Sequence, residues 1–228
     1  MGKETWSNNR NPLTEIEGPR NLTEHVYMRI EKAITEFRIK PGEEIQEVGL
    51  AKQLGTSVTP VREALNRLVG DGLIIREPNK HPRVVKFSEK EIEDLYDIRS
   101  VLESLGVFLA ASHITPDDIA RLRKIQERGK KCHISGDMEG HGVYNAEFHE
   151  AILDLSQNSL LIEMMAKIRK KNMLCMSSTM MIPGMIEQAL KEHAEIIGLL
   201  EKRDTAKVQK AMRRHIELRK KAFLEQLS

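Results

Sequence analysis

Three residues at a fixed spacing, Ala51, Gly55 and Val61, constrain the fold of this 228-residue chain more than any other feature. The small side chain lets a second helix approach the first, and the glycine accepts a left-handed turn conformation between them. The branched apolar residue then anchors the second helix in the core. Thr59 as a cap and Pro60 at the first helical position suit the start of that helix. The spacing therefore predicts a helix-turn-helix unit.

A helix-turn-helix unit inserts the N-terminal end of its second helix into the major groove of DNA. We therefore expect five side chains of this segment to face a nucleic acid: Ser57, Val58, Thr59, Arg62 and Asn66. An arginine can fork onto guanine or hold a phosphate, and an asparagine can pair with an adenine edge. The alternative is an ordinary amphipathic helix with a solvated basic face, and the three spaced residues alone do not decide between the two.

Two β-branched runs follow, at 73–76 and 83–87, on either side of the segment EPNKHP. Short runs of this kind around a proline-rich connection predict a hairpin with an exposed tip. A helix-turn-helix followed by a hairpin is a winged helix. Lys80, His81 and Arg83 on the tip would then meet phosphates or the minor groove.

From residue 88 onward the chain reads as helix, and aromatic residues make up only 4% of the sequence, which favours packed helices over sheet. Ser88 and Glu91 form a capping-box pattern at the start of this part. We expect a mainly α protein with a flexible N-terminal arm at 1–19, a winged helix-turn-helix domain at 20–87 and an antiparallel all-helical domain at 88–228. The helices of the last domain are expected at 89–113, 116–133, 137–156, 160–178, 184–202 and 205–227.

Overall charge excludes a polycation, because the formal net charge is only +2, so any contact with nucleic acid must come from a local basic patch. The two cysteines, Cys132 and Cys175, lack the spacing of a metal finger and suggest reduced thiols in a cytosol. The first twenty residues lack the apolar core of a signal peptide, and no apolar run approaches the ~18 residues of a membrane span. We expect a cytoplasmic protein without a membrane partner.

Four potential metal ligands lie in the C-terminal half. Asn145 and His149 are four residues apart and so share one helix face. His193 and His215 lie at similar distances on either side of a predicted turn at 203–204, which would bring them to a similar height in two antiparallel helices. Three neutral imidazoles and an oxygen suit one divalent ion per chain, with Zn²⁺ or Ni²⁺ as the leading choices. Each histidine taken alone is more often a surface residue or a hydrogen-bonded core residue.

The run PGEEIQEVGLAKQLGTSVTPVREALNRLVGDGLI resembles the DNA-binding domain of GntR-family transcriptional regulators. Residues 90–225 resemble the FCD effector domain of the FadR branch of that family, in LYDIRSVLESLGVFLAA, NAEFHEAILDLSQNSLL, EHAEIIGLLEKRD and AMRRHI. The resemblance implies a homodimer that binds a short palindromic operator in double-stranded DNA. It also implies that Asn145, His149, His193 and His215 are the metal ligands, as in metal-binding members.

Two positions depart from the family pattern. Val58 stands where an arginine usually reads bases, and we expect it to meet a thymine methyl group instead. Asn145 stands where an aspartate is common, which removes a negative charge and should weaken metal binding. His141, one turn before Asn145, is a spare candidate for a metal ligand, but we interpret it as a solvated residue.

Arg99 matches an arginine of the family that can face the effector cavity, where it would pair with a carboxylate effector. The alternative is an exposed salt bridge to Glu103, four residues on. The methionine-rich stretch from Met173 to Met185 is interpreted as pliable lining of the pocket.

These features favour a ligand-responsive transcriptional regulator, with repression as the expected mode and a small organic acid as the effector. One alternative is a metal-dependent enzyme that uses the histidine site. The sequence contains no HExxH, Walker or G-x-S-x-G motif to support enzymatic chemistry. A scaffold protein with a fortuitous winged helix would leave the inward-facing histidines unexplained.

Overall fold

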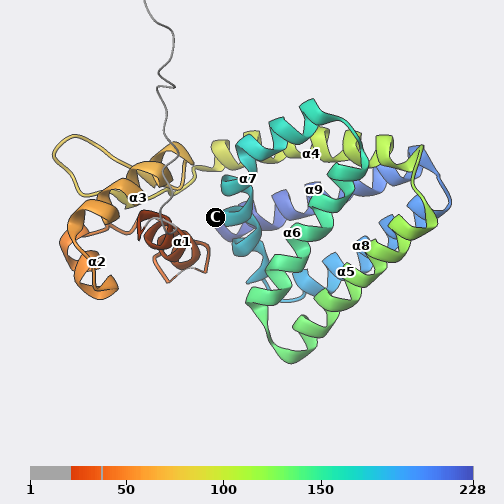
Figure 1. Cartoon of the computed structure of the whole chain (residues 1–228). Helices are drawn as coiled ribbons and strands as arrows, with labels where there is room; N and C mark the ends of the chain where they lie inside the picture. Colours follow the sequence, from red (N-terminus) through yellow and green to blue (C-terminus); the bar gives the residue numbers. More distant parts are fainter. Residues whose placement is uncertain (1–21, 37, 228) are drawn as a thin grey trace, which may run out of the picture.

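The structure, a computed structural model, describes residues 22–36 and 38–227, together with all their side chains except those of 139 and 176–178. The expected arm at 1–19 lies outside the described residues. Figure 1 shows two lobes, a small N-terminal head and a larger helical bundle. The mainly α fold with a winged helix-turn-helix and an all-helical C-terminal part is confirmed.

The head begins with three helices and ends in a short hairpin. Its elements are α1 (Leu22–Thr35), α2 (Glu47–Leu54), α3 (Val58–Gly70), β1 (Ile74–Ile75) and β2 (Arg83–Val84). The two strands are antiparallel, with Ile74 opposite Val84. Gly55 takes a left-handed conformation, with φ 65°, between α2 and α3, and Val61 is completely buried, as the helix-turn-helix spacing predicts.

The start of α3 differs from the expected one. The helix begins at Val58, with Ser57 at the N-cap position and no side-chain cap hydrogen bond. Thr59 and Pro60 therefore lie inside the first turn, so the expectation that Thr59 caps the helix was wrong. Pro60 is tolerated there because the first backbone N–H groups of a helix have no intrahelical partner.

The wing contains a third extended segment that the sequence analysis did not predict. Glu44 forms an isolated antiparallel bridge with Arg83, and Val84 exchanges backbone hydrogen bonds with Gly42 and Glu43, at 2.9 and 3.0 Å. The segment between α1 and α2 thus extends the hairpin on its β2 side and holds the base of the wing.

The bundle consists of six helices: α4 (Glu89–Ala111), α5 (Pro116–Ser135), α6 (Met138–Leu155), α7 (Ser159–Met180), α8 (Met185–Glu201) and α9 (Thr205–Leu227). Capping boxes start α4 at Ser88 and α5 at Thr115, as the local sequence predicts. Helix α4 packs along α9, and α5 packs between α6 and α8. Their apolar faces enclose one core cluster that includes Tyr96, Phe148 and Ile216.

The two lobes meet at α7. Leu174, on α7, is buried within the apolar cluster of the head, together with Ile30, Leu65 and other head residues. Beside it, Lys170 contacts Glu31 and donates a hydrogen bond to the hydroxyl of Tyr27 at 2.7 Å. A helix of the bundle therefore completes the core of the head.

Candidate functional site

Three histidines from three different helices meet inside the bundle. His149 lies on α6, His193 on α8 and His215 on α9, and all three are buried. Each offers a ring nitrogen within 4.8 Å of the other two. Two nitrogens on one ion at ~2.1 Å lie at most ~4.2 Å apart. Small side-chain shifts would therefore let all three bind a common ion.

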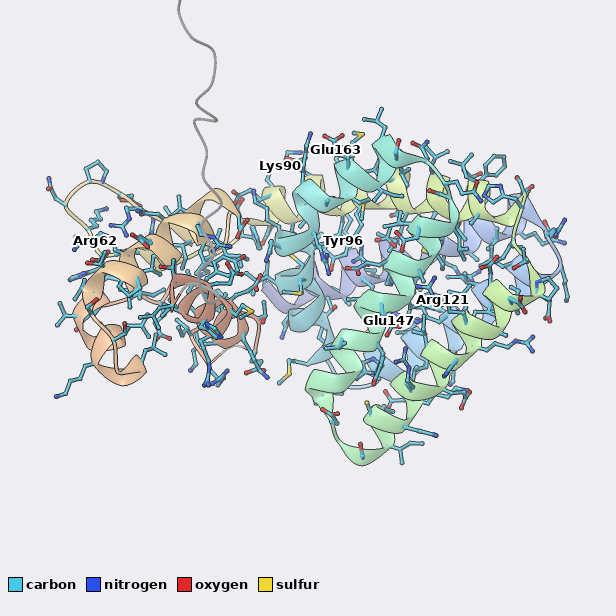
Figure 2. The ribbon with its side chains drawn as sticks, viewed as in Figure 1. Arg62, Lys90, Tyr96, Arg121, Glu147 and Glu163 are labelled. Carbon is cyan, nitrogen blue, oxygen red and sulfur yellow. The ribbon has the colours of Figure 1, made fainter. Side chains whose placement is uncertain are left out.

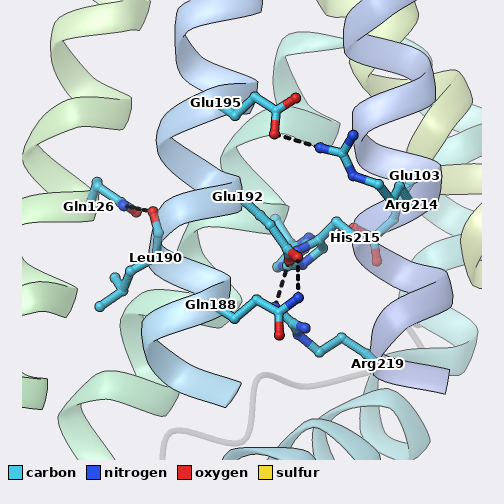
Figure 3. Close-up of polar contacts among 10 residues, drawn as sticks. Glu103, Gln126, Gln188, Leu190, Glu192, Glu195, Arg214, His215 and Arg219 are labelled. Atoms are coloured by element: carbon cyan, nitrogen blue, oxygen red, sulfur yellow. Dashed lines mark hydrogen bonds and ion pairs between the residues drawn. The ribbon is translucent and has the colours of Figure 1, made fainter. Parts of the chain in front are cut away.

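Carboxylates hold two of these rings in place. The Nδ1 atom of His215 donates a hydrogen bond to Glu192 at 2.7 Å, and the Nδ1 atom of His149 donates one to Glu103. Figure 3 shows Glu192 between His215 and Arg219. A carboxylate on Nδ1 fixes the tautomer that leaves Nε2 free to bind a metal.

Two of the three Nε2 atoms of this cluster stand without a hydrogen-bond partner in the part of the chain that the structure describes. The Nε2 atoms of His149 and His193 are buried without a hydrogen bond among the described residues. An unsatisfied buried polar atom costs ~1–3 kcal/mol, so such atoms call for an explanation. A divalent ion on these nitrogens would satisfy both, and the donor set of the site therefore fits a metal.

Burial also favours the neutral rings of His193 and His215, and the neutral ring is the form that binds metal ions. The pKa of His193 lies well below its usual value because burial disfavours the charged ring, and the neighbouring His215 and His149 act in the same direction. The pKa of His215 is lowered for the same reasons, first by burial and then by His149 and Arg219.

The structure places Asn145 beside two of the three histidines. It lines a cavity of about 20 Å³ together with His149 and His215. His141 lines the same cavity and is only 3% exposed, with its Nδ1 atom 3.1 Å from the carbonyl oxygen of Gly129. The interpretation of His141 as a solvated residue was therefore wrong, because its helix face turns toward α5.

Arg99 is 1% exposed and lines the cavity, so the exposed salt bridge considered for it does not form. Its partner in the pair is Glu103, as that alternative supposed, but the pair is buried. Burial alone would raise the pKa of Glu103, yet Arg99 and His149 together hold that pKa well below its usual range. Glu103 therefore stays ionised between the guanidinium of Arg99 and the ring of His149.

A second buried arginine, Arg219, was not predicted from the sequence. It lines the same cavity and donates a hydrogen bond to Glu192 at 2.7 Å. Its Nη1 atom, like that of Arg99, is buried without a hydrogen-bond partner among the described residues. Arg219 lies four residues after His215, so the helical spacing could have placed both on one face. Met180 and Met185 also line this cavity, in agreement with the interpretation of the methionine-rich stretch.

The predicted DNA-facing residues lie mostly on one exposed surface of the head. Ser57, Thr59, Arg62 and Asn66 are exposed on or next to α3. Figure 2 shows Arg62 on the part of the head remote from the bundle. The guanidinium of Arg62 contacts Glu47 at 2.9 Å but its side chain remains 59% exposed. Exposed ion pairs contribute little, so Arg62 can exchange Glu47 for DNA.

Val58 is less exposed than the other predicted DNA-facing residues of α3. Its side chain is only partly exposed and packs against the apolar cluster of the head. A branched apolar side chain in the first turn of α3 gains more from this burial than from solvent exposure. Val58 therefore offers only part of its surface to a thymine methyl group.

The wing presents a compact set of basic side chains. Lys80, His81 and Arg83 are exposed around its tip, where Asn79 takes a left-handed conformation with φ 59°. Asparagine accepts this conformation better than most residues, so the turn needs no glycine. Glu77 pairs with both Lys80 and Arg83.

Both parts of the chain match known families. Residues 22–84 match the family described as bacterial regulatory proteins, gntR family, and residues 94–218 match the FCD domain. The chain belongs to the GntR family. The segment that matches the FCD domain contains all three histidines of the site. The GntR family consists of transcriptional regulators rather than enzymes.

Curated GntR relatives cover much of the chain. The transcriptional regulator McbR of Escherichia coli is 33% identical over 148 residues, which span 65% of this chain and 67% of McbR. A probable D-xylose utilization operon transcriptional repressor of Paenarthrobacter nicotinovorans is 29% identical over 80% of both chains. The uncharacterized regulator YdhC of Bacillus subtilis is 28% identical over 78% of this chain and 80% of its own length.

Solved structures of GntR regulators share the arrangement of head and bundle. The structure of E. coli McbR/YncC superposes with a TM-score of 0.76 at 25% identity, covering 92% of this chain and all of that one. A putative GntR regulator from Rhodococcus has a TM-score of 0.74 at 23% identity, covering 89% and 97%. In the described part of this GntR chain, no helix has the length and apolar character needed to cross a bilayer.

Proposed function

We propose that this GntR regulator is a homodimeric repressor whose bundle holds one divalent ion and senses a small carboxylate. The ion would be held by Asn145, His149, His193 and His215, with Zn²⁺ or Ni²⁺ as the best fits to three imidazoles and an oxygen. The observation that carries the proposal is the pair of buried Nε2 atoms, on His149 and His193, that have no partner among the described residues and lie beside carboxylate-held rings.

A carboxylate effector fits the charges that surround the histidines. Arg99 and Arg219 line the cavity, and each has a buried Nη1 atom without a partner among the described residues. Guanidinium N–H groups bind carboxylates in strong, charge-assisted hydrogen bonds. The bound ion would supply a positive charge and open coordination positions for the same carboxylate.

The effector would act by favouring one arrangement of the head relative to the bundle. It can do so only by binding that arrangement more tightly than the other. Repression is supported by the relative from P. nicotinovorans, whose name describes a probable repressor.

A dimer is supported by an exposed apolar stripe on α4. Ile98, Val101, Leu105 and Phe108 lie at helical spacing and are 36% to 55% exposed. Leu160 and Met164 on α7 are exposed as well. Contiguous exposed apolar side chains of this kind mark protein interfaces, and a second copy would bring two heads to neighbouring turns of an operator.

Metal analysis of protein purified without chelator tests the proposal. We expect about one ion per chain in the wild type, and loss of that ion in His193→Ala. His81→Ala, in the exposed wing, is the matched control and should keep the ion. Equal metal content in wild type and His193→Ala would refute the site. A thermal-shift screen of small carboxylates, with and without metal, then tests the effector class.

A further inference from the structure

The carboxylate of Glu47 joins two arginines on the side of the head that we expect to face DNA. Glu47 is the first residue of α2, and its Oε2 atom accepts a hydrogen bond from Nε of Arg62 at 3.0 Å and lies 2.9 Å from Nη2 of the same side chain. Its Oε1 atom accepts a hydrogen bond from Nη2 of Arg76, directly after β1, at 2.8 Å. One side chain thus ties α2 to α3 and to the base of the wing.

The pair with Glu47 leaves one edge of the Arg62 guanidinium available. Glu47 occupies the edge formed by Nε and Nη2. The other edge, formed by Nη1 and the remaining N–H of Nη2, has no partner among the described residues, and the side chain is 59% exposed. The planar fork of an arginine fits the O6 and N7 atoms of a guanine. Arg62 can therefore read a base without leaving Glu47.

Arg76 holds Glu47 from the other side. The side chain of Glu47 is 13% exposed, against 34% for Arg76, so the carboxylate is the most enclosed member of the group. Burial alone would raise the pKa of Glu47, but the hydrogen bonds from Arg62 and Arg76 lower it overall. The carboxylate therefore stays charged and is held from two sides, while the exposed Arg62 is the member that reaches outward.

An arginine that is held in place discriminates between DNA sequences better than a free one. A long side chain loses conformational freedom at an interface, and a side chain that is already held loses less. Phosphate contacts carry no sequence information and supply nearly all of non-specific binding. The charge of Glu47 and its hold on Arg62 both oppose a contact of Arg62 with a phosphate, whereas the available edge of the fork suits a base.

We infer that Glu47 is a positioning residue for DNA recognition, which holds Arg62 so that its available edge meets a guanine rather than a phosphate. The inference rests on the proposed function as a DNA-binding regulator and adds the residue that sets the orientation of Arg62. Glu47 thus strengthens binding to the operator and weakens binding to other DNA.

The ratio of specific to non-specific affinity tests this inference. Selection from a random-sequence library by the full-length wild type supplies the specific duplex, and a scrambled duplex of equal length and composition is the non-specific one. Fluorescence anisotropy at one salt concentration gives both affinities. Glu47→Gln keeps the size of the side chain and removes its charge. Glu77→Gln is the matched control, because Glu77 also pairs with two basic side chains of the head, Lys80 and Arg83, and is not a partner of Arg62.

We expect Glu47→Gln to lower the affinity ratio by about fivefold, the lower end of what a bidentate base contact contributes to discrimination. Binding to the selected duplex should weaken and binding to the scrambled duplex should tighten. Glu77→Gln should shift both affinities in the same direction and leave their ratio unchanged. In an Arg62→Ala background, Glu47→Gln should have no further effect on the ratio, since it acts through Arg62.

Three results would each overturn the inference and leave a DNA-binding regulator: an unchanged ratio in Glu47→Gln, an equal fall in Glu77→Gln, or an undiminished effect of Glu47→Gln without Arg62. Failure of the wild type to enrich any sequence would overturn the proposed regulator together with the inference. Thermal unfolding checks the fold of Glu47→Gln. Glu47→Asp, which keeps the charge on a shorter side chain, is the second variant and should lower the ratio as well.

Discussion

Glu192 serves two groups of the candidate site at once. Its Oε2 atom accepts a hydrogen bond from the Nδ1 atom of His215 and another from Arg219, both at 2.7 Å. It therefore orients a proposed metal ligand and balances the charge of a cavity-lining arginine. Carboxylates that hold metal-binding histidines in this way are a large part of metal affinity.

We predict that Glu192→Gln lowers metal affinity by roughly 10- to 100-fold, since the amide is a weaker acceptor for the imidazole N–H. Competition with a chelator of known affinity measures the change. Glu195→Gln is the control, because Glu195 lies one turn along the same helix and pairs with Arg214 at the surface. Similar affinities for the two variants would contradict the positioning role of Glu192.

In the head, the residue that we expect to matter most for DNA binding is Arg62, on the exposed face of α3. We predict that Arg62→Ala weakens binding to the DNA upstream of the protein's own gene, by roughly 1–3 kcal/mol if the side chain reads a base. Gel shifts over a range of salt concentrations measure the loss. Arg121→Ala, on the exposed face of α5 in the bundle, removes the same charge and should leave binding unchanged.

At the scale of elements, the helices of the bundle were predictable because their start signals are local. The capping boxes at Ser88 and Thr115 each involve residues only three apart. The extended segment around Glu44 was not predictable, because its pairing with β2 uses backbone atoms and leaves no side-chain pattern.

The candidate site was also predictable in part, because the spacing of its residues along the chain carries information. The similar distances of His193 and His215 from the turn at 203–204 predicted that these two meet, the resemblance to the FCD domain added His149, and the three lie together in the structure. The burial of His141 and the role of Leu174 depend instead on which helices pack against each other. Packing of that kind joins segments far apart in the sequence, and one chain without its structure does not reveal it.

Helix α7 links the bundle to the head, and Leu174 is the apolar part of that link. We predict that Leu174→Ala destabilises the protein by ~2–5 kcal/mol, because it leaves a cavity in the head core. Chemical denaturation measures the change. Ile134→Ala, at an 84% exposed position on α5, should change stability far less. An equal loss in both variants would show that Leu174 does not anchor the head.

At the scale of the whole molecule, the apolar stripe on α4 makes a prediction about assembly. We predict that Val101→Glu shifts the protein from dimer to monomer, because a charge would be buried without a partner in the interface. Light scattering during size-exclusion chromatography measures the mass. Ile134→Glu, at an 84% exposed position on α5, should remain dimeric. A monomeric wild type, or a dimeric Val101→Glu, would contradict this interface.

Leu174 also bears on how such regulators can be recombined. Its side chain fills the head, although it lies about ninety positions beyond the last strand of the wing. A chimera that joins this head to a foreign bundle at residue 87 would inherit whatever side chain the foreign α7 carries at this position. Transplanted heads should therefore keep their stability only when the matching leucine, or a side chain of equal volume, travels with them.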